Sequence, residues 1–345
     1  MKAQYLPPPL TMDINKYLKD LVTTISEYKL SDEEKKTITF EGIQKYIFNK
    51  LNSSKYKASS MSEALEQKVK DKIQKSVKQK KPIHITVPFG GYKKWQLPTY
   101  PYPDWSEVFY LALLRDYLSP IVAGYDNGVL LEFFSDEIFV SRMNNISQKD
   151  LDEYNEQFSE IVKWFSNYLP SNFEIKSSKI RDFISQEEIL KRFEKDINKF
   201  REEWSGLPEK ERNFRLKKSE RNYKGDLSKL SKPEKDKILL ESTLVHDAFI
   251  FGDWDKDTPW AFGELMIALG NRYTGSWGIH VKSTRSSTNQ FWVGVGVLKG
   301  KNGDFIPSSL TYNQYIKLQP KLKEEKVGLF PKEFKNLRSV LVLKN

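Results

Sequence analysis

The chain has 345 residues with a formal net charge of +10, 39% hydrophobic and 30% charged residues, which is typical of a globular protein with one large domain or one and a half. The absence of cysteine excludes disulfides, thiolate metal sites and a cysteine nucleophile, and only three histidines argue against a multi-histidine metal centre. No run approaches about eighteen apolar residues and the start of the chain lacks a signal-peptide pattern, so we expect a cytoplasmic protein without a membrane span.

The N-terminal residues 11–81 are predicted to be helical. Leu18, Val22 and Ile25 recur at helical spacing, and Ser31 followed by Glu34 is typical of a capping box. A basic run then ends at a proline, which predicts a boundary. The predicted organisation is a helical N-terminal region at 1–81, a main domain at 82–320 and a C-terminal segment at 321–345.

A short strand and a glycine turn follow this boundary. The β-branched run from His84 to Val87 lies between prolines, and Gly90-Gly91 allows a sharp turn where the strand ends. In open α/β sheets ligands bind at the carboxyl ends of strands, so we expect Lys93 and Lys94 to line a ligand-binding site at the end of this strand. This segment indicates an anionic small molecule, with a solvated basic loop as the alternative.

From residue 83 onward strands alternate with helices, which favours a layered α/β core. Asp104 is a predicted N-cap of one helix and Ser147 of another. Val129–Phe134 is a predicted buried strand that runs on into 138–140.

The second half of the chain is predicted to hold charged helices at 186–240, as an insertion or a lid. Two further strands are expected at Trp277–Val281 and Gln290–Val297, and Val340–Leu343 is expected to add an edge strand.

The positive charge has two interpretations. A basic surface attracts nucleic acid and other polyanions. However, lysines are interspersed with glutamates along helical stretches such as 191–196, a pattern typical of a solvated helix face. We favour solvation and keep nucleic-acid binding as the alternative.

Two groups of residues suggest chemistry. His280 shares a strand face with Lys282 and lies near Arg285, an arrangement that suits proton transfer by a neutral histidine; a core histidine is the alternative. The carboxylates within 253–257 resemble part of a calcium loop, but a threonine stands where such loops need glycine. We therefore expect no metal there. His84 and His246 are expected to be structural.

Phosphate-loop, dinucleotide-binding and serine-hydrolase motifs are all missing from the chain. Two blocks of sequence instead resemble the isocyanide (isonitrile) synthases of the pyoverdine/dityrosine biosynthesis family. The segments that carry the resemblance are Val87-Pro88-Phe89, Leu97-Pro98, Pro103–Glu107, Phe134–Phe139, Asp152–Tyr154, Arg272-Tyr273 and Ile279-His280.

This resemblance implies a Rossmann-like layered sheet, here with a helical N-terminal extension, and no metal or nucleotide cofactor. It also implies an enzyme that condenses an amino-acid amine with the C2 carbonyl of ribulose 5-phosphate in natural-product biosynthesis, so that C2 becomes the isonitrile carbon. The candidate catalytic residues are His280, Asp136 and Lys93. The candidate substrate-binding residues are the cations Lys94, Arg272, Lys282 and Arg285 and the aromatic side chains Trp95 and Phe139, with Trp292 as a further aromatic candidate. The alternatives are a basic nucleic-acid-binding protein and an enzyme acting on another phosphorylated metabolite.

Overall fold

The computed structural model describes residues 13–24, 28–135, 137–253, 265–268, 278–281, 291–301 and 304–343. The helices in these ranges are α1 (Ile14–Thr23), α2 (Asp32–Lys36), α3 (Ile43–Leu51), α4 (Glu63–Lys78), α5 (Trp105–Gly124), α6 (Glu137–Asn144), α7 (Gln148–Ser166), α8 (Gln186–Trp204), α9 (Glu209–Asn222), α10 (Lys232–Phe251) and α11 (Tyr312–Leu318). The strands are β1 (Ile83–Phe89), β2 (Val129–Ser135), β3 (Phe173–Lys179), β4 (Leu265–Ala268), β5 (Ile279–His280), β6 (Gly294–Lys301), β7 (Asp304–Thr311), β8 (Leu322–Lys326) and β9 (Ser339–Leu343).

A parallel sheet forms the centre of the described molecule, with the strand order β3-β2-β1-β4-β5. This order reverses direction between β1 and β4, as it does in Rossmann folds. The crossovers are helical, with α5 between β1 and β2 and α6 and α7 between β2 and β3. The predicted α/β fold with a Rossmann-like layered sheet is therefore confirmed.

Apolar strand residues explain why this sheet lies at the centre. Ile85 and Val87 of β1 pair with Leu131 and Phe133 of β2, and all four side chains are buried. Continuous apolar runs of this kind are typical of parallel strands covered on both faces. Phe89 closes the end of β1 and meets Phe133 edge to face at 5.8 Å between ring centroids.

The N-terminal helices share this core. Their buried residues belong to the same apolar cluster as those of the sheet and α5, and buried tyrosines join the layers. The Tyr46 hydroxyl donates to the Pro120 carbonyl at 2.6 Å, and the Tyr117 hydroxyl donates to the Leu51 carbonyl at 2.6 Å. The domain boundaries set from the sequence stay predictions, and one continuous core spans the first of them.

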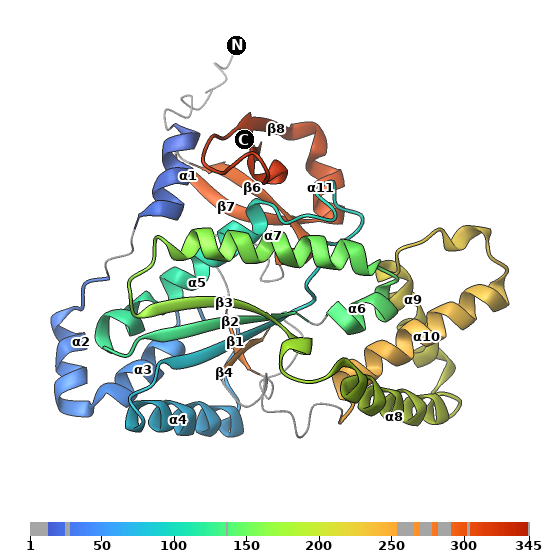
Figure 1. Ribbon diagram of the computed structural model, residues 1–345, viewed down its shortest axis with the longest axis horizontal. Helices are drawn as coiled ribbons and strands as arrows, with labels where there is room; N and C mark the ends of the chain where they lie inside the picture. Colours follow the sequence, from blue (N-terminus) through green and yellow to red (C-terminus); the bar gives the residue numbers. More distant parts are fainter. Residues whose placement is uncertain are drawn as a thin grey trace, which may run out of the picture.

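A second sheet, with the order β7-β6-β9-β8, lies above the central sheet in Figure 1. Its arrangement corrects two expectations. Val340–Leu343 belongs to β9, which pairs with both β6 and β8 and is not an edge strand. The strand expected at Gln290–Val297 begins only at Gly294, after a 3-10 turn at Phe291–Val293, and it belongs to a different sheet from Ile279–His280.

Helix caps follow the sequence signals closely. Ser31 with Glu34 and Asp104 with Glu107 form capping boxes, and Ser147 caps α7.

The expected continuation of β2 into 138–140 is wrong, because these residues lie in α6. Ile138, Phe139 and Val140 are all buried in that helix. A run of three apolar residues fits a buried helix and a buried strand equally well, so the sequence could not distinguish them here.

The helices α8, α9 and α10 lie beyond the carboxyl ends of β1, β2 and β3, on the right of Figure 1. Their position puts the charged segment predicted as an insertion or lid next to the edge where ligands bind in this fold class. Among the described residues, none of the helices is long and apolar enough to cross a bilayer.

Candidate functional site

The turn after β1 places the first residues of the site. Gly91 has φ +64°, and a Cβ atom there would lie 1.9 Å from the Ser135 hydroxyl oxygen at the end of β2. Only glycine fits this left-handed, crowded position. The Asn155 side chain holds the turn by donating to the Gly91 carbonyl at 3.1 Å.

A cavity of about 620 Å³ opens beside this turn, a size typical of small-molecule sites. It lies at the carboxyl ends of β1 and β4, where the strand order reverses, and α6, α9, α10 and the residues around the start of α11 complete its wall. The lining residues are Pro88, Phe89, Gly90, Tyr92, Lys94, Gln96, Phe139, Val140, Met143, Asn144, Lys218, Arg221, Asn222, His246, Phe249, Ile250, Met266, Trp292, Val293, Thr311, Tyr312 and Asn313.

The cavity is positively charged. Lys94, Lys218 and Arg221 line it together with His246, and no aspartate or glutamate is among its described lining residues. Burial lowers the pKa of Lys94, and the charge of Arg221 lowers it further. Two cations held this close without a carboxylate repel each other, and a bound anion would relieve that repulsion.

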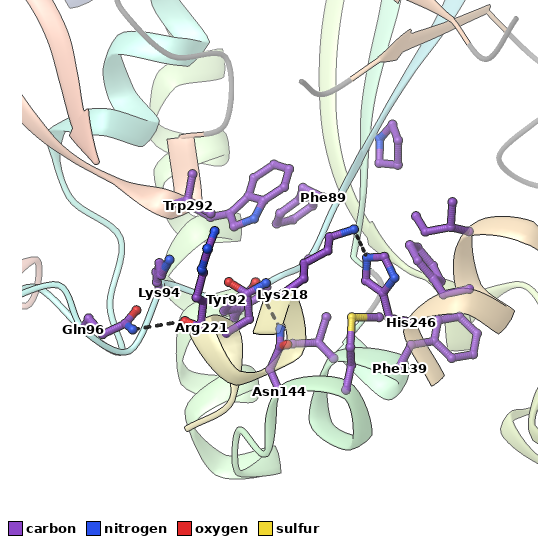
Figure 2. Close-up of a pocket in the computed structure, with 18 of the residues that line it drawn as sticks. Phe89, Tyr92, Lys94, Gln96, Phe139, Asn144, Lys218, Arg221, His246 and Trp292 are labelled. Atoms are coloured by element: carbon purple, nitrogen blue, oxygen red, sulfur yellow. Dashed lines mark hydrogen bonds between the residues drawn. The ribbon is translucent and has the colours of Figure 1, made fainter. Parts of the chain in front are cut away.

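The two ends of the cavity differ in polarity. Figure 2 shows Gln96, Lys94, Arg221 and Trp292 at one end, and Phe139 beyond His246 at the other. At this second end the lining is apolar: the ring centroids of Phe139 and Phe249 are 5.4 Å apart, and Met143 packs against the same apolar cluster. A ligand with one anionic and one apolar part would match both ends.

The charged end is fixed by contacts between the turn and the end of α9. Trp95 donates its indole N–H to the Asn222 carbonyl at 3.3 Å, and Gln96 donates to the Arg221 carbonyl at 3.1 Å. Lys224 then donates to an Asp150 carboxylate oxygen at 2.8 Å. These contacts hold the backbone that carries Arg221 against the strand-end loop.

Lys93 has a different environment from its neighbour. Its ammonium is fully buried and lies 2.8 Å and 2.9 Å from the two Glu107 carboxylate oxygens and 3.1 Å from Asp104 Oδ2. Tyr154 donates its hydroxyl to Glu107 Oε1 at 3.0 Å. Burial raises the pKa of Glu107 to about 7, with Lys93 opposing this shift. Lys93 is not among the residues that line the cavity, so its position supports a structural role and not the catalytic one expected from the sequence.

A second polar group lies between the two ends of the cavity. The Lys218 ammonium is 3.0 Å from His246 Nε2, and His246 Nδ1 is 3.5 Å from Asp247 Oδ1. Arg215 holds the other Asp247 oxygen at 2.6 Å. Lys218 comes from α9 and the His246–Asp247 pair from α10.

The structure brings together part of the residue set expected from the sequence. Lys94, Phe139 and Trp292 line the cavity, and Trp95 supports it from outside. The backbone of His280 lies in β5, at the edge of the central sheet. The remaining predicted site residues, Asp136, Arg272, Lys282 and Arg285, lie outside the described residues, as do 254–257 of the carboxylate run.

Sequence reasoning missed Lys218, Arg221 and His246 as lining residues. Helix α9 has the sequence EKERNFRLKKSERN, whose residues are mostly charged and show no apolar stripe, so its inward face could not be identified. Within the described ranges, no group of three histidine, aspartate or glutamate side chains gathers that could hold a metal ion.

Comparisons with known proteins show similarity at the level of the fold. No family model matches the chain, and no curated protein matches it either. Among solved structures, the fold is similar to that of the PvcA protein from Pseudomonas aeruginosa, with a TM-score of 0.59 and 15% sequence identity over 87% of this chain and 99% of that one. The similarity covers nearly all of PvcA and shows a shared fold.

Proposed function

We propose that the protein is an isocyanide synthase-like enzyme that condenses an amino-acid amine with ribulose 5-phosphate. Two observations of different kinds support this proposal. The sequence blocks described above resemble isocyanide synthases of the pyoverdine/dityrosine family, and PvcA, a member of that family, has the same fold.

The observation that carries the proposal is the cationic cavity at the switch point of the sheet, which has no aspartate or glutamate among its described lining residues. Lys94, Lys218 and Arg221 converge there from the strand-end loop and α9. Arginine and lysine are the side chains that bind phosphate groups most strongly, through charge-assisted hydrogen bonds. A sugar phosphate fits this end of the cavity, and the apolar end around Phe139 would hold the amino-acid side chain.

The proposed reaction sets clear demands on the site. The amine must lose a proton before its nitrogen attacks the C2 carbonyl, and water must leave to form the imine. His280 and Asp136 are proposed to transfer protons, and Arg272, Lys282 and Arg285 to add to the phosphate-binding cations. Lys93 is proposed to hold the strand-end loop through Glu107 and Asp104. No cofactor is required by this proposal.

The direct test is mass spectrometry of the purified chain incubated with ribulose 5-phosphate and pooled amino acids. We expect one amino acid to be consumed and its isonitrile to form. Arg221→Met should abolish product, whereas Lys217→Met, an exposed lysine of the same helix outside the cavity, should leave it unchanged. Binding of other phosphorylated metabolites without isonitrile formation would contradict the proposed reaction and favour a different enzyme on this fold. Salt-sensitive binding of RNA or DNA without product would favour the nucleic-acid alternative.

A further inference from the structure

The lysine–histidine contact in the cavity is chemically unusual. An ammonium group has three donors and no acceptor, so Lys218 must donate to His246 Nε2 across the 3.0 Å contact. Nε2 therefore carries a lone pair, and the proton of the neutral ring lies on Nδ1. This orientation points the Nδ1 proton toward Asp247 Oδ1, 3.5 Å away.

Asp247 is itself held in place. Its second oxygen accepts a hydrogen bond from Arg215 at 2.6 Å, and its side chain is nearly buried at 6% exposure. A carboxylate behind one ring nitrogen fixes the tautomer of a histidine and stabilises the imidazolium that forms when the other nitrogen takes a proton. The arrangement from Arg215 through Asp247 to His246 thus prepares Nε2 as a proton acceptor inside the cavity.

In the structure, however, Lys218 occupies that acceptor. Figure 2 shows the Lys218 side chain reaching across the cavity from the region of Arg221 to the ring of His246. No carboxylate is among the described residues that line the cavity, so an anion bound at its cationic end would attract the Lys218 ammonium away from a neutral ring. A charge-assisted hydrogen bond to phosphate is stronger than one to neutral imidazole.

We propose that Lys218 and His246 form an anion-gated base. Binding of a phosphate ester at the Lys94–Arg221 end draws the Lys218 ammonium to the anion and frees His246 Nε2 to accept a proton from the second substrate. The gate rests on the proposed function for its two substrates, but the movement of Lys218 requires only an anion.

In the proposed reaction the substrate ammonium gives one N–H proton to His246 Nε2, the electron pair of that bond stays on the substrate nitrogen, and the ring becomes imidazolium beside Asp247. The amine then attacks the C2 carbonyl, the carbonyl electron pair moves to the oxygen, and a proton moves from the nitrogen to that oxygen to form a hydroxyl group. The imidazolium returns its proton to this hydroxyl group, which leaves C2 as water when the protonated imine forms. Gating by the phosphate ester keeps the base blocked until the electrophile is bound.

Nuclear magnetic resonance of the full chain labelled with ¹⁵N-histidine tests the gate directly, because the chain has only three histidines. His246→Gln assigns the signals. Without ligand, we expect Nδ1 of His246 to be protonated and Nε2 to show a hydrogen-bonded lone pair. Inorganic phosphate or ribulose 5-phosphate should shift the Nε2 signal. Lys218→Met should show the shifted signal from the start, and Lys217→Met should behave as the wild type.

The outcomes separate the gate from the proposed function. A proton on Nε2 in the ligand-free protein, or saturating phosphate binding with no change at Nε2, overturns the gate alone. Absence of any anion binding overturns the gate and the proposed function together. Where isonitrile forms, His246→Gln should lower kcat by about 100-fold or more, as loss of a general base does, with little change in KM. Unchanged kcat in that variant would contradict the catalytic role of His246.

Discussion

Lys93 and Lys94 are neighbours in sequence but lie in opposite electrostatic environments. Lys93 is fully buried and is held by the carboxylates of Glu107 and Asp104. Lys94 lines the cavity, and the charge of Arg221, a second cation, lowers its pKa beyond the effect of burial. One lysine has its charge balanced inside the protein, and the other does not.

We infer from this difference that Lys93 is a structural cation and Lys94 a binding one. A buried charge whose partner is part of the fold holds elements together, here the strand-end loop and the start of α5, and removing it leaves charges unpaired. A cation that lies near another cation is not neutralised by it, so it can still attract an anionic ligand. We therefore expect substitution of Lys93 to lower the stability of the fold and substitution of Lys94 to weaken anion binding.

The largest effect is expected for Lys93→Met. Loss of the ammonium leaves Glu107 and Asp104 buried without a counter-ion, and breaking such a pair costs about 3–5 kcal/mol of the free energy of unfolding. Urea denaturation followed by circular dichroism measures this cost. Lys94→Met is the matched control and should cost less than about 1 kcal/mol. Equal losses in the two variants would show that Lys93 has no special structural role.

The turn that precedes the two lysines gives the next effect. Gly91→Ala forces a Cβ atom to 1.9 Å from the Ser135 hydroxyl oxygen at a φ of +64°, so we expect a loss of about 1–3 kcal/mol or more. Gly328→Ala is the control, because a Cβ there meets nothing within 4 Å. Thermal unfolding of both variants measures the difference. A Gly91→Ala protein as stable as the control would mean that the turn can relax without cost.

Lys94→Met should weaken anion binding while leaving the fold intact. A hydrogen bond to a charged group contributes about 1.5–3 kcal/mol, so the Kd for ribulose 5-phosphate should rise by about 10- to 100-fold. Isothermal titration calorimetry measures the Kd, with Lys217→Met as the charge-matched control. If the affinity loss is the same in the control, only net charge matters and the cavity assignment fails.

The pH dependence of binding gives the smallest and most specific effect. The pKa of Lys94 is below its usual value because of burial and Arg221, and only the ammonium form attracts a phosphate. As the pH rises through this lowered pKa the ammonium is lost, so affinity should fall at a lower pH than for an ordinary lysine. Calorimetry above neutral pH should also detect proton uptake on binding in the wild type. The same pH profile in Lys94→Met would contradict this assignment.

The sequence predicted those parts of the site that depend on local signals. The apolar strand, the Gly90-Gly91 turn and the helix cap at Asp104 are encoded within a few residues, and the strand and the turn placed Lys94 at the cavity. Phe139 was a candidate in a run predicted as strand, and it lines the cavity from α6. The sequence could not tell Lys93 from Lys94, because the buried partner Glu107 lies 14 residues away and its contact depends on how the loop packs.

The contribution of α9 and α10 was hidden for a related reason. Charged residues surround α9 on all sides, so only its packing against α10 and the strand-end loop shows which cations face inward. Parts of β6 and β9 were predicted as strands, but not as members of a second sheet, and β8 was missed because its sequence LKEEK is mixed in polarity. Pairing partners far apart in sequence, and not local propensity, determine such strands.

We expect the cavity at the ends of β1 and β4 to bind a sugar phosphate through Lys94 and Arg221. A crystal structure of the chain with ribulose 5-phosphate tests this most directly. The account predicts the phosphate group within hydrogen-bond distance of Lys94 Nζ and the Arg221 guanidinium, with Lys218 turned away from His246. An empty cavity, with the sugar phosphate bound elsewhere on the protein, would contradict it.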